Sequence, residues 1–421
     1  MLTASASSIP DIGELIRPDR IHRSVYSDPV IFELEMCRIF EKTWVYVAHE
    51  SELRMPGDYK TAYIGLQPVI LARTEDGRLT GLFNRCTHRA SVICRYERGN
   101  ANFFRCPYHA WTFKNTGELI GVPRRDRYPP DFDPRDFDAV KVPRLESYRG
   151  FVFASMNPEV EPIADYLAQA RRWLDAQIDL SIEGTVSLSA GAHRHTYHGN
   201  WKLQAENGVD GYHAVYLHET YFNLRKMHGR ESDRFGPRDE SLGWTMSFDN
   251  GHALLARQLL DDQIATVRSQ FTDYYDRLER LRGKDRMREL LTQKNLFIFP
   301  NLYVLLNQVR VIRPVSPSET VVTMYPFFLD GAPAELNAQR LRDHQIGFAP
   351  SGFVGPDDYA AFECVTEGLN AGGVPWLLLL RGIHDERIES DGSRVGAPSD
   401  ETTQRGIYRR YRELMLAKDA E

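Results

Sequence analysis

The sequence predicts an α+β fold made of a β-rich unit and a larger mixed region. Between about Trp44 and Asn157, short apolar runs such as V-I-L-A-R and F-V-F-A-S-M alternate with turn signals such as E-D-G-R and N-T-G-E, which is typical of a compact all-β unit. Farther along, helical stretches alternate with strands, and 421 residues exceed the usual size of one core. We expect an N-terminal helical segment over residues 1–43 that packs on the larger region, a β unit over 44–160 and the larger region over 161–421.

The N-terminal segment and the start of the larger region each predict a helix. Ile31, Leu34, Ile39 and Phe40 roughly keep a helical period, so an amphipathic helix should lead into the first sheet. Residues 162–180 also place their apolar side chains on one face, which predicts a single helix there.

The larger region is expected to combine charged helices with an antiparallel sheet. Residues 262–294 are rich in Asp, Arg, Glu and Leu and are predicted to be helical. The runs L-Y-V-L-L-N-Q-V-R-V-I-R-P and T-V-V-T-M-Y-P-F-F predict neighbouring antiparallel strands joined by the turn V-S-P-S-E. Two further helices are predicted at about 334–347 and 357–371, and a final one in R-G-I-Y-R-R-Y-R-E-L-M.

The composition is that of a globular protein and excludes several classes of partner. No apolar run is long enough to span a bilayer, and the start of the chain has no basic region followed by an apolar core, so the cytoplasm is the expected location. The net charge is −6 with no polybasic block, which argues against nucleic acid and anionic membranes as partners. Five cysteines are an odd number, which favours metal ligands or buried thiols over disulfides.

The stretch from Asn200 to His218, N-W-K-L-Q-A-E-N-G-V-D-G-Y-H-A-V-Y-L-H, is a candidate metal site. Asp210 precedes His213 by one helical turn, and Glu206 lies one turn earlier. Positions five apart diverge by about 140° around a regular helix, so His213 and His218 can hold one ion only if the helix is widened or broken. The glycines of this stretch favour such a distortion. The alternative is a polar helix with ordinary histidines.

A second candidate site lies in the β unit, where Cys86-Thr-His88 is followed after seventeen residues by Cys106-Pro-Tyr-His109. Two thiolates and two imidazoles can bind a tetrahedral zinc ion or a [2Fe–2S] cluster with both Cys on one iron and both His on the other. Each loop supplies one Cys and one His, which suits the asymmetric cluster better. The remaining alternative is four residues without a shared ligand role. Cys94 lies between the loops and is expected to be a buried free thiol.

These residues carry a resemblance to a known family. The spacing C-x-H, seventeen residues, C-x-x-H resembles the Rieske signature, and D-G-Y-H-A-V-Y-L-H is similar to the mononuclear iron motif in catalytic α-subunits of Rieske non-haem iron ring-hydroxylating oxygenases. The resemblance runs from about residue 25 to the end. It implies a β-rich Rieske [2Fe–2S] domain and a catalytic domain in which helices grip an antiparallel sheet. It also implies that His213 and His218 are iron ligands and that Asp210 links them to a cluster histidine.

The third iron ligand is expected to be a carboxylate, which completes a facial triad with open positions for dioxygen. The segment G-F-V-G-P-D-D-Y-A-A-F-E contains two acids, and the family pattern favours Asp358 over Asp357. Pro356 predicts a helix start that places both acids in the first turn. We expect Asp357 to act only as a charge at the helix N-terminus.

The resemblance also implies partners and a chemistry. Electrons derived from NAD(P)H would arrive through a reductase or a ferredoxin. The α-subunits would form a trimer, with or without small β-subunits, in which Asp210 accepts hydrogen bonds from His213 and from His109 of an adjacent subunit. Asn207 either borders the open iron position or is simply a polar helix residue.

The expected substrate is an aromatic ring that carries a carboxylate. F-P-N-L-Y-V-L-L-N-Q-V-R-V-I-R-P-V-S-P and G-P-D-D-Y-A-A-F-E look most like the benzoate, toluate, anthranilate and salicylate branch of the family. Arg310 and Arg313 lie three apart on a predicted strand and so on opposite faces. Arg310, on the face of Ile312, is expected to bind the carboxylate, unless it pairs with a structural acid instead.

Three functions are compatible with these motifs to different degrees. The first is a multicomponent dioxygenase that makes a cis-dihydrodiol from an aromatic acid. The second uses the same metals for monooxygenation, as in salicylate-type ring hydroxylation or O- and N-demethylation. The third is a pure Rieske electron carrier, and about 260 further residues with a second metal constellation argue against it.

Overall fold

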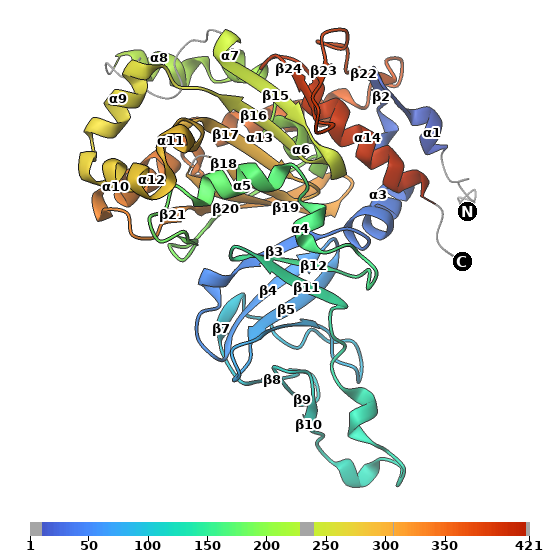
Figure 1. Cartoon of the computed structure of the whole chain (residues 1–421). Helices are drawn as coiled ribbons and strands as arrows, with labels where there is room; N and C mark the ends of the chain where they lie inside the picture. Colours follow the sequence, from blue (N-terminus) through green and yellow to red (C-terminus); the bar gives the residue numbers. More distant parts are fainter. Residues whose placement is uncertain (1–10, 228–239, 306, 418–421) are drawn as a thin grey trace. The chain divides into compact units, whose positions relative to one another are not determined.

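The computed structural model describes residues 11–227, 240–305 and 307–417, which form the two units drawn in Figure 1. The β unit comprises Phe40–Ile163 and Ser187–Ser189, and the large unit comprises Met1–Ile39, Ala164–Val186 and Ala190–Glu421. Within the described part of the chain, no helix is both long and apolar enough to cross a membrane. The expectation of an α+β fold is confirmed.

The β unit consists of three antiparallel sheets around an apolar core that includes Trp111 and Phe113. The strand orders are β11-β12-β3, β6-β5-β4-β7 and β10-β9-β8. Their bounds are β3 (Val45–His49), β4 (Asp58–Ile64), β5 (Gln67–Arg73), β6 (Leu79–Phe83), β7 (Arg98–Asn100), β8 (Phe103–Arg105), β9 (Thr112–Lys114), β10 (Leu119–Gly121), β11 (Arg144–Tyr148) and β12 (Phe151–Ser155), with short 3-10 turns at Glu50–Glu52, Arg125–Arg127 and Pro134–Phe137.

The N-terminal segment contains the expected amphipathic helix. The carboxylate of Asp28 accepts hydrogen bonds from the backbone N–H groups of Val30 and Ile31 and so caps a helix that begins at Pro29. Ile31 and Ile39 are fully buried. The elements are α1 (Ile12–Leu15), β1 (Ile16–Arg17), β2 (Arg20–His22), α2 (Ser24–Ser27), α3 (Pro29–Glu35) and a π-helical turn (Met36–Phe40), and β1 and β2 form a small sheet with β22 (Trp376–Leu378).

The core of the large unit is a nine-stranded antiparallel sheet in the order β14-β20-β19-β18-β17-β16-β15-β24-β23. The strands are β14 (His193–Tyr197), β15 (Gly243–Ser247), β16 (Ala253–Arg257), β17 (Gln293–Ile298), β18 (Leu302–Leu305), β19 (Gln308–Ser316), β20 (Glu319–Pro326), β23 (Arg387–Ile388) and β24 (Arg394–Gly396), and two short strands, β13 (Val186–Ser187) and β21 (Phe328–Leu329), lie outside this sheet.

The single strand expected over 302–314 is in fact a hairpin. β18 ends at Leu305, β19 begins at Gln308, and the two strands pair with Leu305 opposite Gln308. The run is apolar on both sides of the connection, so the sequence carries no alternation that would mark the reversal. The following β19–β20 hairpin over Ser316 and Glu319 is as predicted.

One row of side chains shows which face of the sheet bears the site. Direct partners in an antiparallel sheet share a face, and the register runs from Met324 through Arg310 and Tyr303 to Phe297 and Ala253. Helices α6, α12 and α13 pack on this face, whereas α5 packs on the other, where Gln177 donates to backbone carbonyls of β17 and β18 (Figure 1).

The helices are α4 (Ile163–Tyr166), α5 (Ala170–Ile178), α6 (Trp201–Asn207), α7 (His213–Leu217), α8 (Glu219–Met227), α9 (Asp261–Ser269), α10 (Thr272–Arg282), α11 (Lys284–Leu291), α12 (Ala334–Phe348), α13 (Gly355–Gly368) and α14 (Thr402–Leu416), with 3-10 turns at Glu240–Leu242 and Asp249–Gly251.

One stretch predicted as a single helix, 162–180, and one predicted to be helical, 262–294, are both interrupted. Residues 162–180 form α4 and α5, separated where Ala168 adopts a φ of 44°. Residues 262–294 form α9, α10 and α11 and then the first residues of β17, with a break at Gly283, whose φ is 87°. Left-handed backbone conformations end a right-handed helix. The apolar face of 162–180 and the composition of 262–294 indicated helix but not where it is interrupted.

Candidate functional site

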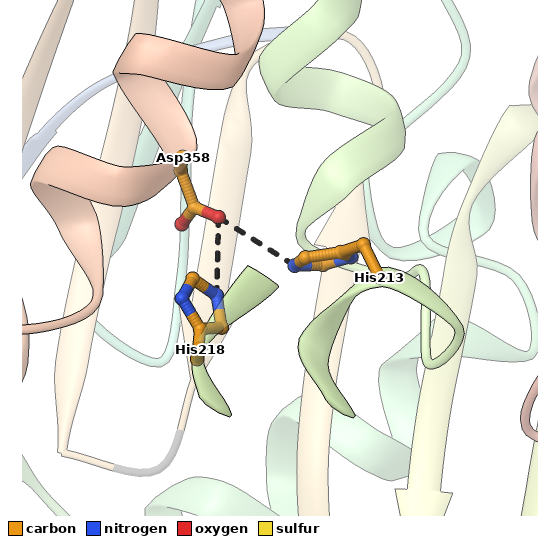
Figure 2. A group of neighbouring side chains, drawn as sticks. All are labelled: His213, His218 and Asp358. Atoms are coloured by element: carbon orange, nitrogen blue, oxygen red, sulfur yellow. Dashed lines mark ion pairs between the residues drawn. The ribbon is translucent and has the colours of Figure 1, made fainter. Parts of the chain in front are cut away.

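His213, His218 and Asp358 meet at one point of the large unit (Figure 2). The Nε2 atoms of His213 and His218 lie 3.5 Å and 3.2 Å from Oδ1 of Asp358. His213 opens α7, His218 follows its last residue, and Asp358 lies in the first turn of α13, which begins at Gly355 with Pro356. The structure therefore brings together the three side chains that the sequence singled out as iron ligands.

The helix that carries the two histidines is broken, not widened. α6 ends at Asn207 and α7 begins at His213, so the intervening residues turn the chain. The two glycines of this turn allow close packing that a side chain would prevent. A Cβ at Gly208 would lie 2.6 Å from the Tyr303 ring, and one at Gly211 would lie 2.3 Å from the carbonyl oxygen of Pro398. α7 ends at Leu217, and His218 follows it in a non-helical conformation (φ −101°, ψ 25°), so the angle between positions five apart in a regular helix does not apply to this pair.

A carboxylate lies behind each imidazole. Nδ1 of His213 is 3.0 Å from Oδ2 of Asp210, and Nδ1 of His218 is 3.4 Å from Oδ2 of Asp357. Outer carboxylates of this kind orient the rings of metal-binding histidines and fix their tautomers. The expectation that Asp357 is only a helix-terminal charge is wrong, because its position in the first turn of α13 also directs it to His218. Sequence spacing could not show this contact between distant segments.

The charges at the triad favour a cation. Burial raises the pKa of Asp358, but hydrogen bonds and charge from His213 and His218 outweigh it and hold the pKa well below its usual range. Burial lowers the pKa of His213, but its hydrogen bonds to Asp210 and Asp358 outweigh this effect and raise the pKa to about 9. The carboxylates thus stabilise positive charge where the rings meet. Two imidazoles and a carboxylate within 4.8 Å of one another match the facial ligand set of non-haem Fe(II).

Asn207 contacts two of the three triad side chains. Its Nδ2 is 3.1 Å from Nε2 of His213 and donates to Oδ1 of Asp358 at 3.1 Å. The amide therefore contacts the same atoms that would face a metal ion. Asn207 is the last residue of α6, directly before the break, and this position allows its side chain to reach the triad.

Glu206, next to Asn207, has a structural environment that its sequence position alone did not reveal. Its carboxylate accepts hydrogen bonds from the hydroxyl groups of Tyr26 and Tyr408. Burial raises its pKa to about 7, although the tyrosine hydroxyls act in the opposite direction. Glu206 therefore ties the helix before the triad to the N-terminal segment and to α14, and it does not contact the candidate ligands.

Arg310 lies on the same face of the sheet as the triad and lines the same cavity, whose volume is about 790 Å³. Its side chain is almost fully buried (2% exposed), and its guanidinium lies 5.4 Å from the centre of the Phe348 ring. Arg313 is half-buried on the opposite face. Among the described residues, no carboxylate lies within ion-pair distance of Arg310, and its buried Nε has no hydrogen-bond partner. Pairing with a structural acid, the alternative left open by the sequence, is not found in the described part of the chain.

In the β unit, the two Cys/His loops have nearly the same backbone. The N–H of Ala90 donates to the carbonyl of Cys86, and that of Ala110 donates to the carbonyl of Cys106, both at 3.0 Å. Both alanines adopt left-handed φ values of 59° and 58°. Each loop thus closes by the same turn four residues after its cysteine, so the two Cys/His loops have matching backbones.

The four side chains of these loops face one another. The rings of His88 and His109 are 4.8 Å apart between centres, and Trp111 stacks on His88 at 4.8 Å. Cys86 and Cys106 are buried and free, and their thiols contact each other. Nδ1 of His88 is buried without a hydrogen-bond partner, so a ligand atom is available there.

The two thiols differ in their electrostatic environment, and that of Cys106 favours the thiolate. Burial opposes the ionisation of Cys106, but hydrogen bonds from the backbone N–H groups of Tyr108 and His109 outweigh it and lower the pKa of this thiol. Burial raises the pKa of Cys86, and the neighbouring Cys106 thiol adds to this effect, although hydrogen bonds from the backbone N–H groups of His88 and Arg89 act in the opposite direction. Cys94 is also buried and free but belongs to the core, as expected. Two thiols and two imidazoles, each type paired, fit a [2Fe–2S] cluster.

A two-Cys, two-His set and a two-His, one-carboxylate set together define an enzyme with two iron centres, and the comparisons agree. The family model for the Rieske [2Fe-2S] domain matches residues 43–148, and that for the ring hydroxylating alpha subunit (catalytic domain) matches residues 187–417. The chain is similar to the 2-halobenzoate 1,2-dioxygenase large subunit of Burkholderia cepacia, with 36% identity over 86% of this chain and 80% of the relative.

Two further relatives support the same family. The toluate 1,2-dioxygenase subunit alpha of Pseudomonas putida is 36% identical over 84% of this chain and 80% of the relative. The structure of naphthalene 1,2-dioxygenase from Rhodococcus sp. bound to indole superposes with a TM-score of 0.84 at 26% identity, covering 95% of each chain. The chain belongs to the Rieske non-haem iron aromatic-ring-hydroxylating dioxygenases, as an α-subunit. Its cofactors are a Rieske [2Fe–2S] cluster and a mononuclear iron.

Proposed function

We propose that this α-subunit hydroxylates an aromatic ring that carries a carboxylate, using dioxygen and electrons derived from NAD(P)H. The single observation that carries this proposal is Arg310, a buried guanidinium without a carboxylate partner among the described residues, in the cavity of the iron triad. Taking a charge out of water without a partner costs several kcal/mol, and a substrate carboxylate would offset this cost through a charge-assisted pair. The names of the halobenzoate and toluate relatives denote substrates of this class.

Each site residue has a role in this proposal. His213, His218 and Asp358 hold the iron, and Cys86, His88, Cys106 and His109 hold the cluster. When bound, the cluster would supply single electrons, and the mononuclear iron would activate dioxygen. Asp210 and Asp357 orient the two iron-binding rings through Nδ1, and Asn207 borders the position next to Nε2 of His213.

The electron route implies an assembly. We infer a trimer in which Asp210 of one copy also accepts a hydrogen bond from the cluster ligand His109 of the next copy. Asp210 is suited to this role because its carboxylate is partly exposed while it contacts His213. A reductase or ferredoxin would deliver the electrons, and small β-subunits would accompany the α-subunits, as the term "large subunit" for the halobenzoate relative suggests.

The test is a substrate screen with the reconstituted holoenzyme, a reductase and NADH. Benzoate, anthranilate and salicylate are compared with their carboxylate-free analogues. A charge-assisted pair contributes about 1.5–3 kcal/mol, so acids should be preferred by at least about tenfold in kcat/KM. Arg310→Leu should lose this preference and keep both metals. Arg313→Leu, the same change on the opposite face of β19, is the matched control and should keep it.

Two outcomes decide between the alternatives. Equal turnover of acids and neutral rings by the wild type would refute the aromatic-acid assignment. Labelled dioxygen separates the two chemistries, because both oxygen atoms enter the product of dioxygenation and one is released as water in monooxygenation.

A further inference from the structure

A charged loop that follows β10 in the β unit (Figure 1) carries three aromatic rings. Residues 124–138, R-R-D-R-Y-P-P-D-F-D-P-R-D-F-D, consist of Arg, Asp and Pro apart from Tyr128, Phe132 and Phe137. Most of the charged side chains of this loop are exposed, as charged groups usually are. The three rings are therefore the side chains through which the loop can pack on the β unit. We call Tyr128, Phe132 and Phe137 the aromatic cover.

The aromatic cover lies against Trp111. The ring centres of Tyr128, Phe132 and Phe137 are 6.2 Å, 6.1 Å and 6.0 Å from that of Trp111. Within the cover, the Phe132 ring lies 4.5 Å from Tyr128 and 5.1 Å from Phe137. Aromatic pairs at such separations are favourable beyond the apolar area that they bury. All three aromatic side chains of the loop thus converge on one tryptophan.

Trp111 connects the cover to one of the proposed cluster ligands. Its ring is 2% exposed and stacks on His88 at 4.8 Å, with the two planes 8° apart. The ring of the other histidine, His109, instead contacts Tyr108 and Arg89, which are both exposed. One histidine therefore has aromatic surroundings, and the other has polar and exposed ones.

The loop that carries the cover is fixed to the first Cys/His loop. The hydroxyl of Thr87, which belongs to that loop, donates to the backbone carbonyl of Phe137 at 2.6 Å. The carboxylate of Asp138 accepts a hydrogen bond from the N–H of Leu119 at 2.7 Å, and that of Asp133 caps the short turn Pro134–Phe137. These bonds hold the cover in place over Trp111.

An apolar layer next to a Rieske cluster affects its redox equilibrium. Two thiolates, two sulfides and two neutral imidazoles balance the charge of two ferric ions, so the oxidised cluster is neutral and the reduced cluster carries a negative charge. A charge is less stable in apolar surroundings than in water, and the exposure of such a centre to solvent is one of the factors that set its potential. An aromatic layer that excludes water therefore lowers the reduction potential.

We propose that the aromatic cover holds the ring of His88 in place through Trp111 and excludes water from that side of the [2Fe–2S] cluster. The cover thereby lowers the reduction potential, which favours onward transfer of the electron to the mononuclear iron. It also slows the loss of the cluster. Tyr128, Phe132 and Phe137 are positioning residues, because they act through Trp111.

The experiment uses the α-subunit with its cluster bound. The double variant Phe132→Ala/Phe137→Ala removes two rings of the cover, and two quantities are measured at one pH. These are the midpoint potential, from a redox titration followed by the visible absorbance of the cluster, and the rate at which an iron chelator bleaches that absorbance. The potential should become more positive, and bleaching should be at least about tenfold faster.

Two further variants serve as controls. Phe132→Leu/Phe137→Leu keeps apolar side chains over Trp111 and should restore most of both values. Phe103→Ala removes an aromatic side chain of β8 in the same unit, which is 58% exposed and lies outside the cover. This variant should leave the potential and the bleaching rate as in the wild type.

The potential separates this role from a purely structural one. If the Ala double variant keeps the cluster absorbance and the wild-type potential, the proposal is refuted even if the protein melts at a lower temperature. A Leu double variant that shifts as far as the Ala variant would contradict the exclusion of water. If the Ala double variant loses the cluster during purification, Phe137→Ala alone, which removes a ring that is 36% exposed, replaces it. A smaller shift in the same direction would then support the proposal, and wild-type values would refute it.

Discussion

Nδ1 of His213 lies 3.0 Å from Oδ2 of Asp210, while Nε2 of the same ring faces Asp358. One imidazole thus connects an inner carboxylate, which would touch the metal, with an outer, partly exposed one. This arrangement lets a mutation at Asp210 disturb ring orientation and electron delivery without removing a proposed iron ligand.

We predict that Asp210→Ala keeps a cluster that is reduced as in the wild type but loses product formation by about 10- to 100-fold, the usual effect of removing an outer carboxylate. Electron paramagnetic resonance of the reduced protein and product yield per electron measure the two effects. Turnover near the wild-type rate would exclude the bridging role.

Removal of Asp358 should have the opposite signature. We predict that Asp358→Ala loses the mononuclear iron and retains the cluster iron, because the remaining pair of imidazoles binds the ion too weakly. Iron analysis together with the cluster absorbance measures both. Asp357→Ala is the control, since this carboxylate contacts Nδ1 of His218 and not Nε2; it should keep most of the mononuclear iron. Full iron occupancy in Asp358→Ala would move the third ligand elsewhere.

The buried carboxyl of Glu206 should make stability depend on pH. Burial raises its pKa from 4.5 to about 7, so the folded protein holds this proton more tightly than the unfolded chain. The protonated group therefore contributes to stability below about pH 4.5. This contribution is lost as the pH rises to about 7, and the loss amounts to about 3 kcal/mol.

We predict that Glu206→Gln removes this part of the pH dependence. The difference in unfolding free energy between wild type and variant should fall steadily from pH 5 to pH 7.5, as chemical denaturation at each pH would show. If the unfolding free energies of the two proteins instead change with pH in parallel, Glu206 is not protonated in the folded state near neutral pH.

The sequence by itself indicated most of the chemistry, because the chemistry depends on residue type and short spacing. C-x-H and C-x-x-H each lie within one loop, His213 and His218 lie within one stretch, and Asp358 follows a proline that starts a helix. The amphipathic N-terminal helix and the β19–β20 hairpin were predicted for a related reason, since local periodicity and turn residues are visible along the chain.

Only the tertiary structure decided how distant segments meet. The helix breaks at Ala168 and Gly283 follow from single backbone angles that apolar periodicity does not record. The contact of Asp357 with His218 and the approach of Phe137 to Trp111 depend on packing between segments that are separated in sequence. Local propensity is set by neighbours along the chain, whereas these contacts are set by which faces are buried together, and that is a property of the whole fold.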